Sequence, residues 1–290
     1  MKIYNLGSLN IDYVYKVDHF VRAGETLSSS DMQVFPGGKG LNQSIALARA
    51  GAQVVHGGAV GGDGAFLLDI MKDSGVDVNR VKAEAGSTGH AIIQVDTSGQ
   101  NCILLFAGAN HKIDREYVEG FLSDAGAGDI LLLQNEVNSL DLIFEVAHGK
   151  GMEIAFNPSP FNDSILKLPL DYVKWWFCNE IEGAALFGAG TPGEIADSFM
   201  KRYPSANLIL TLGGDGSIYK SGGEYCEQPI YPVKAVDTTA AGDTFTGYFL
   251  HSVATGKTPA EALDMASKAS SVTVSRPGAS VSIPYMNEIV

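Results

Sequence analysis

The sequence predicts an α/β fold in which two layers of helices cover a mostly parallel central sheet. From residue 129 onward, apolar runs of strand length alternate with segments of helical periodicity. This βαβα order predicts parallel strands, because each helix carries the chain back across the sheet. Several short strand-like runs nearer the N-terminus have no helix between them, and these predict a separate small sheet.

The elements of the main sheet follow in chain order. Strands are expected at residues 3–9, 54–60, 130–133, 153–156, 172–177 and 208–212, with two further strands at 217–220 and 224–228. Helices are expected at 44–50, 65–74, 140–148, 180–187, 194–203, 244–253 and 259–271, and Asp63 is expected to cap the second of them. The 290 residues, 45% of them hydrophobic, suffice for one large α/β core, so residues 1–290 are predicted to form a single domain.

The small sheet is expected to form a flap, which we call the lid. Its strands are predicted at 13–17, 32–35, 89–95 and 102–106, so that the lid spans about residues 12–36 and 88–107. A flap with an apolar face must cover either a substrate entrance or a partner subunit.

The composition excludes several classes of protein. The net charge of -13 disfavours nucleic acid as a partner, because nucleic acids need a basic surface. No apolar run has the roughly 18 residues of a membrane span, and the first ten residues do not resemble a signal peptide. Three widely spaced cysteines indicate free thiols rather than disulfides or a zinc site. We therefore expect a cytoplasmic protein with no membrane partner.

The segment from Val236 to Phe245 has the sequence VDTTAAGDTF and precedes a predicted helix. Small residues before a helix leave its N-terminal amide groups uncovered, and such a terminus binds anions. Gly242 lets a phosphoryl group approach, and Asp243 could take a proton from the hydroxyl that attacks it. The alternative is that Asp237, Thr239 and Asp243 only cap the helix.

Other polar residues follow the predicted strands at the same edge of the sheet. Asn10, Asp12 and Glu136 could bind a ligand there, although Asn10 and Asp12 also suit a simple turn. The glycine-rich segment 37–43 is not a Walker A loop, and its Asn42 suits sugar hydroxyls. It could also be only a helix start.

Two further segments at this edge suit a nucleotide. Asn179 and Glu182 follow another strand, and Glu182 could organise a hydrated Mg²⁺ or be only a solvated residue at a helix start. The glycines of residues 213–216 also follow a strand, and they form a candidate nucleotide loop.

These segments together resemble the ribokinase-like (PfkB-type) carbohydrate kinases. One signature of that family is similar to residues 37–44, with Gly51 and Gly61 at the expected spacings, and a second is similar to residues 237–243. The likeness extends over essentially the whole chain. It implies a three-layer α/β/α sandwich with a β-sheet lid, and transfer of the ATP γ-phosphoryl group to a sugar hydroxyl.

The resemblance also implies residue roles. Asp243 corresponds to the catalytic base, and the amide groups of Ala240, Ala241 and Gly242 correspond to an anion hole. The sugar site would contain Asn10, Asp12, Gly38, Lys39, Asn42 and Glu136. The nucleotide side would contain Asn179, Thr211, Gly213, Gly216 and Ser267. A K⁺ loop would contain Asp237, Thr239, Thr273, Arg276, Gly278 and Ser282.

Three residues depart from the family pattern. Tyr248 replaces a small residue behind the anion hole, and His90 and Phe106 are larger or more polar than usual in the lid. We expect an ATP-dependent kinase of a neutral free sugar, with D-ribose, converted to ribose 5-phosphate, as the leading candidate. The lid aromatics leave a nucleoside kinase as the alternative, and a non-catalytic sugar sensor is a further one. The apolar lid face predicts a homodimer.

Overall fold

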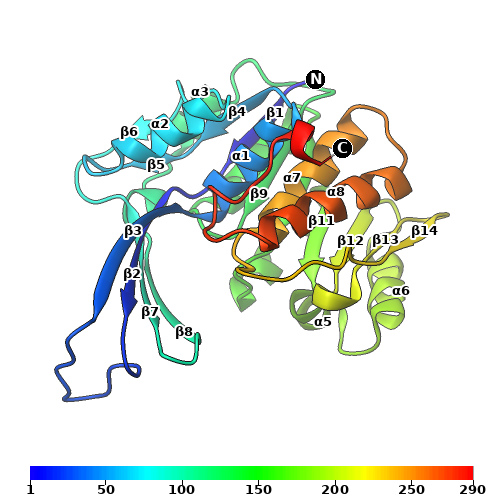
Figure 1. Cartoon of the computed structure of the whole chain (residues 1–290). Coiled ribbons are helices and arrows are strands. Elements are labelled where there is room, and N and C mark those ends of the chain that lie inside the picture. The colour runs from blue at the N-terminus through cyan, green and yellow to red at the C-terminus, as the bar shows by residue number, and fades with distance from the viewer. Residues whose placement is uncertain (290) are drawn as a thin grey trace.

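The computed structural model describes residues 1–289 and has an eight-stranded main sheet (Figure 1). The strand order is β14-β13-β12-β11-β10-β9-β1-β4, and all neighbours are parallel except at β13 and β14. The strands are β1 Ile3–Leu6, β4 Val54–Gly57, β9 Ile130–Gln134, β10 Glu153–Asn157, β11 Val173–Asn179, β12 Asn207–Thr211, β13 Ser217–Lys220 and β14 Tyr225–Gln228. The predicted α/β class with a mostly parallel sheet is confirmed.

Helices cover both faces of this sheet (Figure 1). They are α1 Lys39–Ala50, α2 Ala65–Asp73, α3 Arg115–Phe121, α4 Leu140–Gly149, α5 Glu180–Phe187, α6 Pro192–Arg202, α7 Ala241–Ala254 and α8 Pro259–Val274. Single-turn helices are η1 Gly108–His111, η2 Asp163–Lys167, η3 Leu170–Tyr172, η4 Gly213–Asp215 and η5 Met286–Glu288. Helix α3 was not predicted; Asp114 caps it by accepting a hydrogen bond from the Tyr117 amide.

The strands divide their side chains between two hydrophobic cores. Leu132, Phe177 and Ile209 belong to the core that contains residues of α1, α2, α7 and α8. Their chain neighbours Leu133, Trp176 and Leu210 belong to the core that contains residues of α3, α4, α5 and α6. Successive side chains of a strand face opposite sides, so this alternation produces the three layers.

The lid is a separate four-stranded sheet that projects away from the main sheet (Figure 1). Its order is β3-β2-β7-β8, with β2 Asn10–Lys16, β3 Asp31–Gly37, β7 Gly89–Val95 and β8 Asn101–Phe106. A two-stranded sheet of β5 Ala59–Val60 and β6 Lys82–Ala83 lies outside the lid. Asn10 and Asp12 are therefore the first residues of a lid strand, and the turn interpretation is wrong.

Side chains from distant segments fix the root of the lid. The Asp63 carboxylate accepts hydrogen bonds from the Thr88 amide at 2.8 Å and from its hydroxyl at 2.6 Å, directly before β7. The N-cap residue, directly before α2, is Gly64, and no side chain caps the helix, so the prediction that Asp63 caps it was wrong. Across the root, the Asn110 side-chain nitrogen donates to Asn10 Oδ1 at 2.7 Å.

Within residues 1–289, none of the helices combines the length and apolar character that crossing a membrane requires.

Candidate active site

The site is built around the N-terminus of α7, which no side chain caps. The residue before the helix, Ala240, has φ 62°, a left-handed conformation that an alanine adopts only at a cost. The amide groups of Gly242 and Asp243 have no hydrogen-bond partner within residues 1–289, whereas that of Ala241 reaches the Thr238 carbonyl at 3.3 Å. The alternative that Asp237, Thr239 and Asp243 cap this helix is therefore wrong.

Open space surrounds this helix terminus. A Cβ atom on Gly242 would meet nothing within 4 Å. The amide groups of Gly242 and Asp243 therefore remain free to bind an anion that arrives from the cavity.

Asp243 is largely buried, with 8% of its surface exposed, and two side-chain amides hold its carboxylate. Asn42 Nδ2 donates to Asp243 Oδ2 at 3.1 Å, and Gln43 Nε2 donates to Oδ1 at 2.9 Å. Both amides come from α1. An amide N–H can only donate, so the contacts keep both carboxylate oxygens as acceptors.

A cavity of about 210 Å³ lies in front of this carboxylate. Asn179 and Thr211 line it from two strand ends, and Lys39 of α1, Glu182 of α5 and the segment 240–243 line it from helix starts. Carboxyl ends of parallel strands commonly form ligand sites. The structure thus brings the predicted catalytic residues, one predicted sugar residue and two predicted nucleotide residues together.

Two other predicted sugar residues, Glu136 and Gly38, lie next to Lys39, either in contact with it or in the chain. Glu136 Oε2 accepts a hydrogen bond from the Lys39 amide at 3.0 Å and another from the Ser8 hydroxyl. Gly38 has φ 95°, and a Cβ atom there would lie 3.0 Å from the backbone of Ser8 and Asn10. Only glycine suits this position, which places the start of α1 against the end of the first strand.

Two carboxyl groups of the predicted sugar site have raised pKa values. Burial, and then the charge of Glu136, raise the pKa of Asp12 to about 7. Burial also raises the pKa of Glu136, although Lys39 opposes this. Burial works against the charge on Lys39, but Asp243, Glu136 and Glu182 leave its pKa raised. The site therefore holds one partly buried cation among several acids.

A second cavity of about 360 Å³ adjoins the first, and both include Thr211, Ala241 and Gly242 in their walls. It contains the predicted nucleotide residues Gly213, Gly216 and Ser267, with apolar walls from Ile230, Tyr231, Val233, Phe245 and Val274. An apolar cavity that ends at an uncapped helix terminus suits a base at one end and phosphates at the other. Asn179 lies in the first cavity instead.

Glu182 is buried rather than solvated, so the interpretation as a solvated residue is wrong. Its carboxylate accepts a hydrogen bond from the Asn179 amide at 3.0 Å, and Asn179 Oδ1 accepts from the Glu182 amide at 2.8 Å. This is a capping box, but Glu182 also lines the first cavity. Within residues 1–289, no group of three or more acids, histidines or cysteines could hold a metal.

The predicted K⁺ loop consists of two segments that Asp237 joins. Its Oδ2 accepts from the Gly278 amide at 3.0 Å, and its Oδ1 accepts from the Thr239 amide at 2.9 Å. The Thr273 hydroxyl contacts that of Thr244 at 3.0 Å, and the Ser282 hydroxyl donates to Ala279 at 2.7 Å. The Arg276 side chain pairs with Glu288 at 2.8 Å. Arg276 could therefore offer a cation only its carbonyl oxygen.

The lid aromatics face away from the sugar residues. His90 lies 5.0 Å from Phe106 and 5.9 Å from Tyr13, measured between ring centroids. Asp12 faces the other side of the lid, because it is the neighbour of Tyr13 in β2. His90 and Phe106 therefore do not line a slot for a nucleoside base on the Asp12 side of the lid. The pairing register instead places Phe35 on the Asp12 side.

Tyr248, which departs from the family pattern behind the predicted anion hole, is fully buried in α7. Its hydroxyl donates to the Pro284 carbonyl at 2.7 Å. The larger side chain therefore attaches the C-terminal segment to the helix that carries Asp243.

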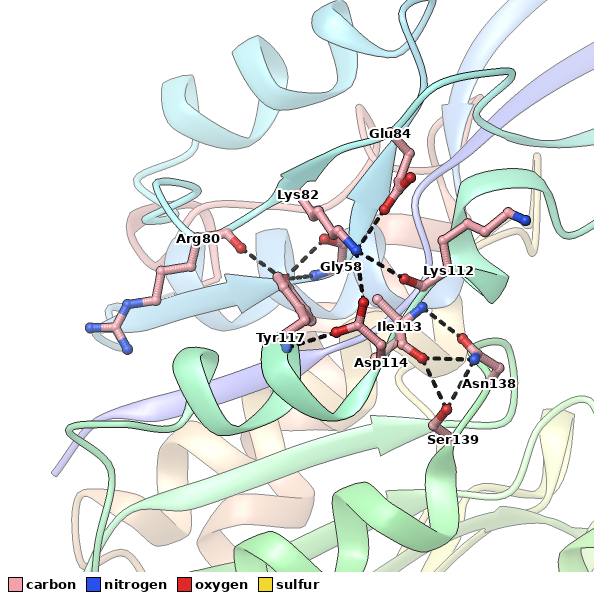
Figure 2. Close-up of polar contacts among 10 residues, drawn as sticks. All are labelled: Gly58, Arg80, Lys82, Glu84, Lys112, Ile113, Asp114, Tyr117, Asn138 and Ser139. Carbon is pink, nitrogen blue, oxygen red and sulfur yellow. Dashed lines mark hydrogen bonds and ion pairs between the residues drawn. The ribbon is translucent and has the colours of Figure 1, made fainter.

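A polar cluster around Ile113 and Asn138 was not predicted (Figure 2). Asn138 exchanges two hydrogen bonds with the backbone of Ile113, at 3.0 and 2.8 Å, and the Ser139 hydroxyl donates to the same carbonyl at 3.0 Å. Asn138 lies two residues after Glu136, and Ile113 lies three residues after Asn110, which contacts Asn10. The cluster thus joins the segments that carry two of the predicted sugar residues, Asn10 and Glu136.

The same close-up shows how α3 is attached to the rest of the molecule (Figure 2). Lys82 pairs with Glu84 at 2.7 Å and Asp114 at 3.1 Å, and the Tyr117 hydroxyl accepts from the Gly58 amide at 2.7 Å.

Comparisons with known proteins agree with this geometry. The sequence profile of the pfkB family carbohydrate kinases matches residues 2–286. A ribokinase from Schizosaccharomyces pombe is 36% identical, covering 98% of this chain and 95% of the relative. A crystal structure of ribokinase from Cryptococcus neoformans in complex with ADP has a TM-score of 0.88 at 31% identity, covering 99% of this chain and 98% of that one.

A structure of Arabidopsis thaliana ribokinase complexed with ribose and ATP has a TM-score of 0.86 at 29% identity, covering 99% of this chain and 97% of that one. A profile that matches almost the whole chain, together with full-length relatives above 30% identity, shows the family. The chain belongs to the PfkB family of carbohydrate kinases.

Proposed function

We propose that this protein, acting as one domain over residues 1–290, uses ATP to phosphorylate the 5-hydroxyl of D-ribose, yielding ribose 5-phosphate. The observation that carries the proposal is Asp243, a buried carboxylate that lines the first cavity at an uncapped helix terminus, next to Ala241 and Gly242, which line both cavities. The relatives named above support the choice of ribose and ATP.

In the proposed reaction, the sugar hydroxyl oxygen bonds to the γ-phosphorus of ATP while the bond from that phosphorus to the bridging oxygen breaks. Asp243 accepts the hydroxyl proton, and ADP leaves. The free amide groups of Gly242 and Asp243 donate to the phosphoryl oxygens as negative charge develops there. Ala240 and Ala241 position these groups, and Lys39, which lines the same cavity, adds a positive charge.

The nucleotide fits the second cavity, with its phosphates directed toward Gly213, Gly216 and the start of α7, and with Thr211, Asn179 and Ser267 nearby. Mg²⁺, when bound, would neutralise the phosphate oxygens. The residues present fit such an ion, because Mg²⁺ beside phosphates needs only one or two carboxylates, and the buried Glu182 can bind its hydration shell.

The sugar site explains why a neutral sugar is the proposed acceptor. Asn10, Asp12, Asn42 and Glu136 offer short amide and carboxylate groups that pair with several hydroxyls. A sugar that lacks one hydroxyl would leave a buried partner unmatched, which is a strong basis for rejection. A sugar phosphate would need a bidentate cationic clamp, and Lys39 is the only cation among the proposed sugar residues.

We further propose that K⁺ binds the loop containing Asp237, Thr239, Thr273, Arg276, Gly278 and Ser282. Asp237 already holds its two segments together, and carbonyl and carboxylate oxygens suit a hard cation. The ion would stabilise the segment that leads into the anion hole.

We also propose a homodimer formed through the lid. The lid sheet ends in β3 and β8, whose outer edges are unpaired within residues 1–289, and Leu104 and Phe106 are 67% and 55% exposed. A second copy of the chain would cover these strand edges and these apolar side chains.

The three cysteines form no disulfide within residues 1–289, which supports a cytoplasmic location.

The test is the specificity ratio kcat/KM for ribose against adenosine, fructose and fructose 6-phosphate at the same salt. Ribose should exceed each by at least about tenfold. If adenosine were the better substrate, the enzyme would be a nucleoside kinase, and Phe35 would be the first residue to substitute.

The role of Asp243 has its own test. Asp243→Asn should lower kcat by about two to four orders of magnitude while ATP and ribose still bind, as calorimetry would show. Turnover above about a tenth of the wild type would contradict a base at this position. If the variant loses turnover and also no longer binds ribose or ATP, this would instead contradict a purely chemical role for Asp243.

A further inference from the structure

The side chain of Gln43 contacts Asp243 but belongs to no predicted site. It is fully buried in α1, directly after Asn42. Its nitrogen donates to Asp243 Oδ1 at 2.9 Å and to Asn157 Oδ1 at 3.1 Å, which uses both of its hydrogens. Its oxygen accepts from Gln134 Nε2 at 2.6 Å. All hydrogen-bonding groups of this amide except one lone pair are therefore engaged.

Backbone carbonyls at both ends of this network determine its orientation. Asn157 Nδ2 donates to the Phe177 carbonyl at 2.8 Å, so its oxygen must face Gln43. Asn5 Nδ2 donates to the Gly40 carbonyl at 2.9 Å, so its oxygen must accept from Gln134 at 3.0 Å. With Asn5 so oriented, Gln134 must also present its nitrogen to Gln43.

Rotating the Gln43 amide by half a turn would place its oxygen against the acceptors of Asp243 and Asn157. It would also place its nitrogen against the nitrogen of Gln134. Three contacts would become unfavourable at once around a fully buried side chain, where an unpaired polar group is costly. Gln43 can therefore present only a donor to Asp243.

We propose that Gln43 is a positioning residue that holds the Asp243 carboxylate in one orientation for proton transfer. The inference rests on the proposed role of Asp243 as the base. Asn42 and Gln43 hold one carboxylate oxygen each, so the plane of the carboxylate is set by two contacts from α1. Asn42 alone would leave the carboxylate free to rotate about its remaining contact.

The network also connects Asp243 to the sugar side of the site. Gln134 is the last residue of β9, two residues before Glu136. The base on α7 is therefore linked through two amides to the strand end that presents a sugar-binding carboxylate. A displacement of a reacting group by about 1 Å can cost roughly 100-fold in rate, so this link has a measurable consequence.

The experiment compares Gln43→Leu and Gln43→Glu with a matched control, Asn207→Leu, in the full-length protein. Asn207 is also a buried amide with two hydrogen bonds, to Lys174 and Tyr219, but it begins β12, at the end of the sheet away from the site. Gln43→Leu should lower kcat for ribose by about 10- to 100-fold, with KM for ATP changed by less than about threefold. Asn207→Leu should lower the melting temperature comparably but leave kcat within about twofold.

Gln43→Glu keeps the size of the side chain and supplies a second variant if Gln43→Leu does not fold. A carboxyl group can donate to Asp243 only while it carries a proton. The kcat of Gln43→Glu relative to the wild type should therefore be highest at low pH and fall as pH rises. The relative kcat of Gln43→Leu should not depend on pH in this way.

Equal kcat in Gln43→Leu and wild type, or equal kcat losses in Gln43→Leu and Asn207→Leu, would overturn the proposal. So would a relative kcat of Gln43→Glu that is constant with pH. Asp243→Asn separates this failure from that of the proposed function. If Asp243→Asn is inactive but Gln43→Leu is normal, only the positioning role is wrong; if Asp243→Asn is active, the base assignment is wrong.

Discussion

A Cβ atom on Gly247 would lie 2.5 Å from the Cβ atom of Ala46, so helices α7 and α1 cross with no room for a side chain between them. This crossing brings the amides of Asn42 and Gln43, on α1, to the carboxylate of Asp243, on α7. Two hydrogen bonds at the proposed base therefore depend on a glycine one helical turn further along.

Gly247→Val should force the two helices apart. Overpacking of this kind costs about 1–3 kcal/mol of stability, and kcat should fall because both amide contacts to Asp243 lengthen. Thermal unfolding and ribose kinetics would measure the two effects. Gly120→Ala is the matched control, since Gly120 is a helical glycine with nothing near its missing Cβ atom; it should be neutral or slightly stabilising. Unchanged activity in Gly247→Val would show that the close crossing is not needed.

The raised pKa of Asp12 predicts how ribose use depends on pH. The carboxyl has a pKa of about 7, so it is protonated below that pH and ionised above it. The ionised form accepts more hydrogen bonds from sugar hydroxyls. At saturating ATP, kcat/KM for ribose should rise with pH through about 7 and lose roughly tenfold per pH unit on the acid side.

Two substitutions test the assignment of this pH dependence. Asp12→Asn should remove the inflection near pH 7. Glu136→Gln removes the neighbouring negative charge that helps to raise the Asp12 pKa, and should move the inflection to lower pH. An inflection near pH 7 that persists in Asp12→Asn must belong to another group.

The K⁺ loop predicts activation by a monovalent cation. At fixed ionic strength and fixed Mg²⁺ concentration, kcat in K⁺ should exceed kcat in Na⁺ by roughly tenfold. This effect is smaller than the loss of kcat that follows the removal of one hydrogen-bond donor from an anion hole. Asp237→Asn should reduce this activation, because Asp237 joins the two segments of the loop. Equal rates in the two salts would mean that the loop is held together without an ion.

The lid predicts a dimer. Light scattering at micromolar concentration should give twice the 30.7 kDa of one chain. Leu104→Glu should shift the mass toward the monomer, because it places a charge on an apolar lid surface. Leu166→Glu changes a leucine that is also exposed but lies in η2, far along the chain from the lid, and should leave the mass unchanged. A monomeric wild type would exclude this assembly.

The sequence was sufficient for the parts of the molecule that local patterns encode. Alternating apolar runs predicted the strands of the main sheet, and small residues before Asp243 predicted an uncapped helix. Contacts between segments that lie far apart in the chain could not be predicted from these local patterns. Asp63 resembles a helix cap in sequence, but its partner Thr88 lies 25 residues away. Neither the residue types around Asp63 and Thr88 nor the spacing between the two residues indicates that they pair.

Two other features depended on information that the sequence does not carry. The side of the lid on which His90 lies depends on its pairing with Ile11, and a shift of one residue would reverse it. Gln43, Gln134 and Asn5 lie far apart in the chain, and buried amides cannot be distinguished from surface amides by residue type alone. Their network became visible only once α1, β9 and β1 were packed together.

The anchored root of the lid gives this sheet the mechanics of a cantilever. Asp63 holds β7 at Thr88, and Asn110 holds β2 at Asn10, while the far ends of the strands project away from the main sheet (Figure 1). In a beam clamped at one end, deflection grows with distance from the clamp. On this basis Asp12, close to the clamp, would keep its place in the proposed sugar site, and the tip would be the part that moves most when the proposed second copy binds.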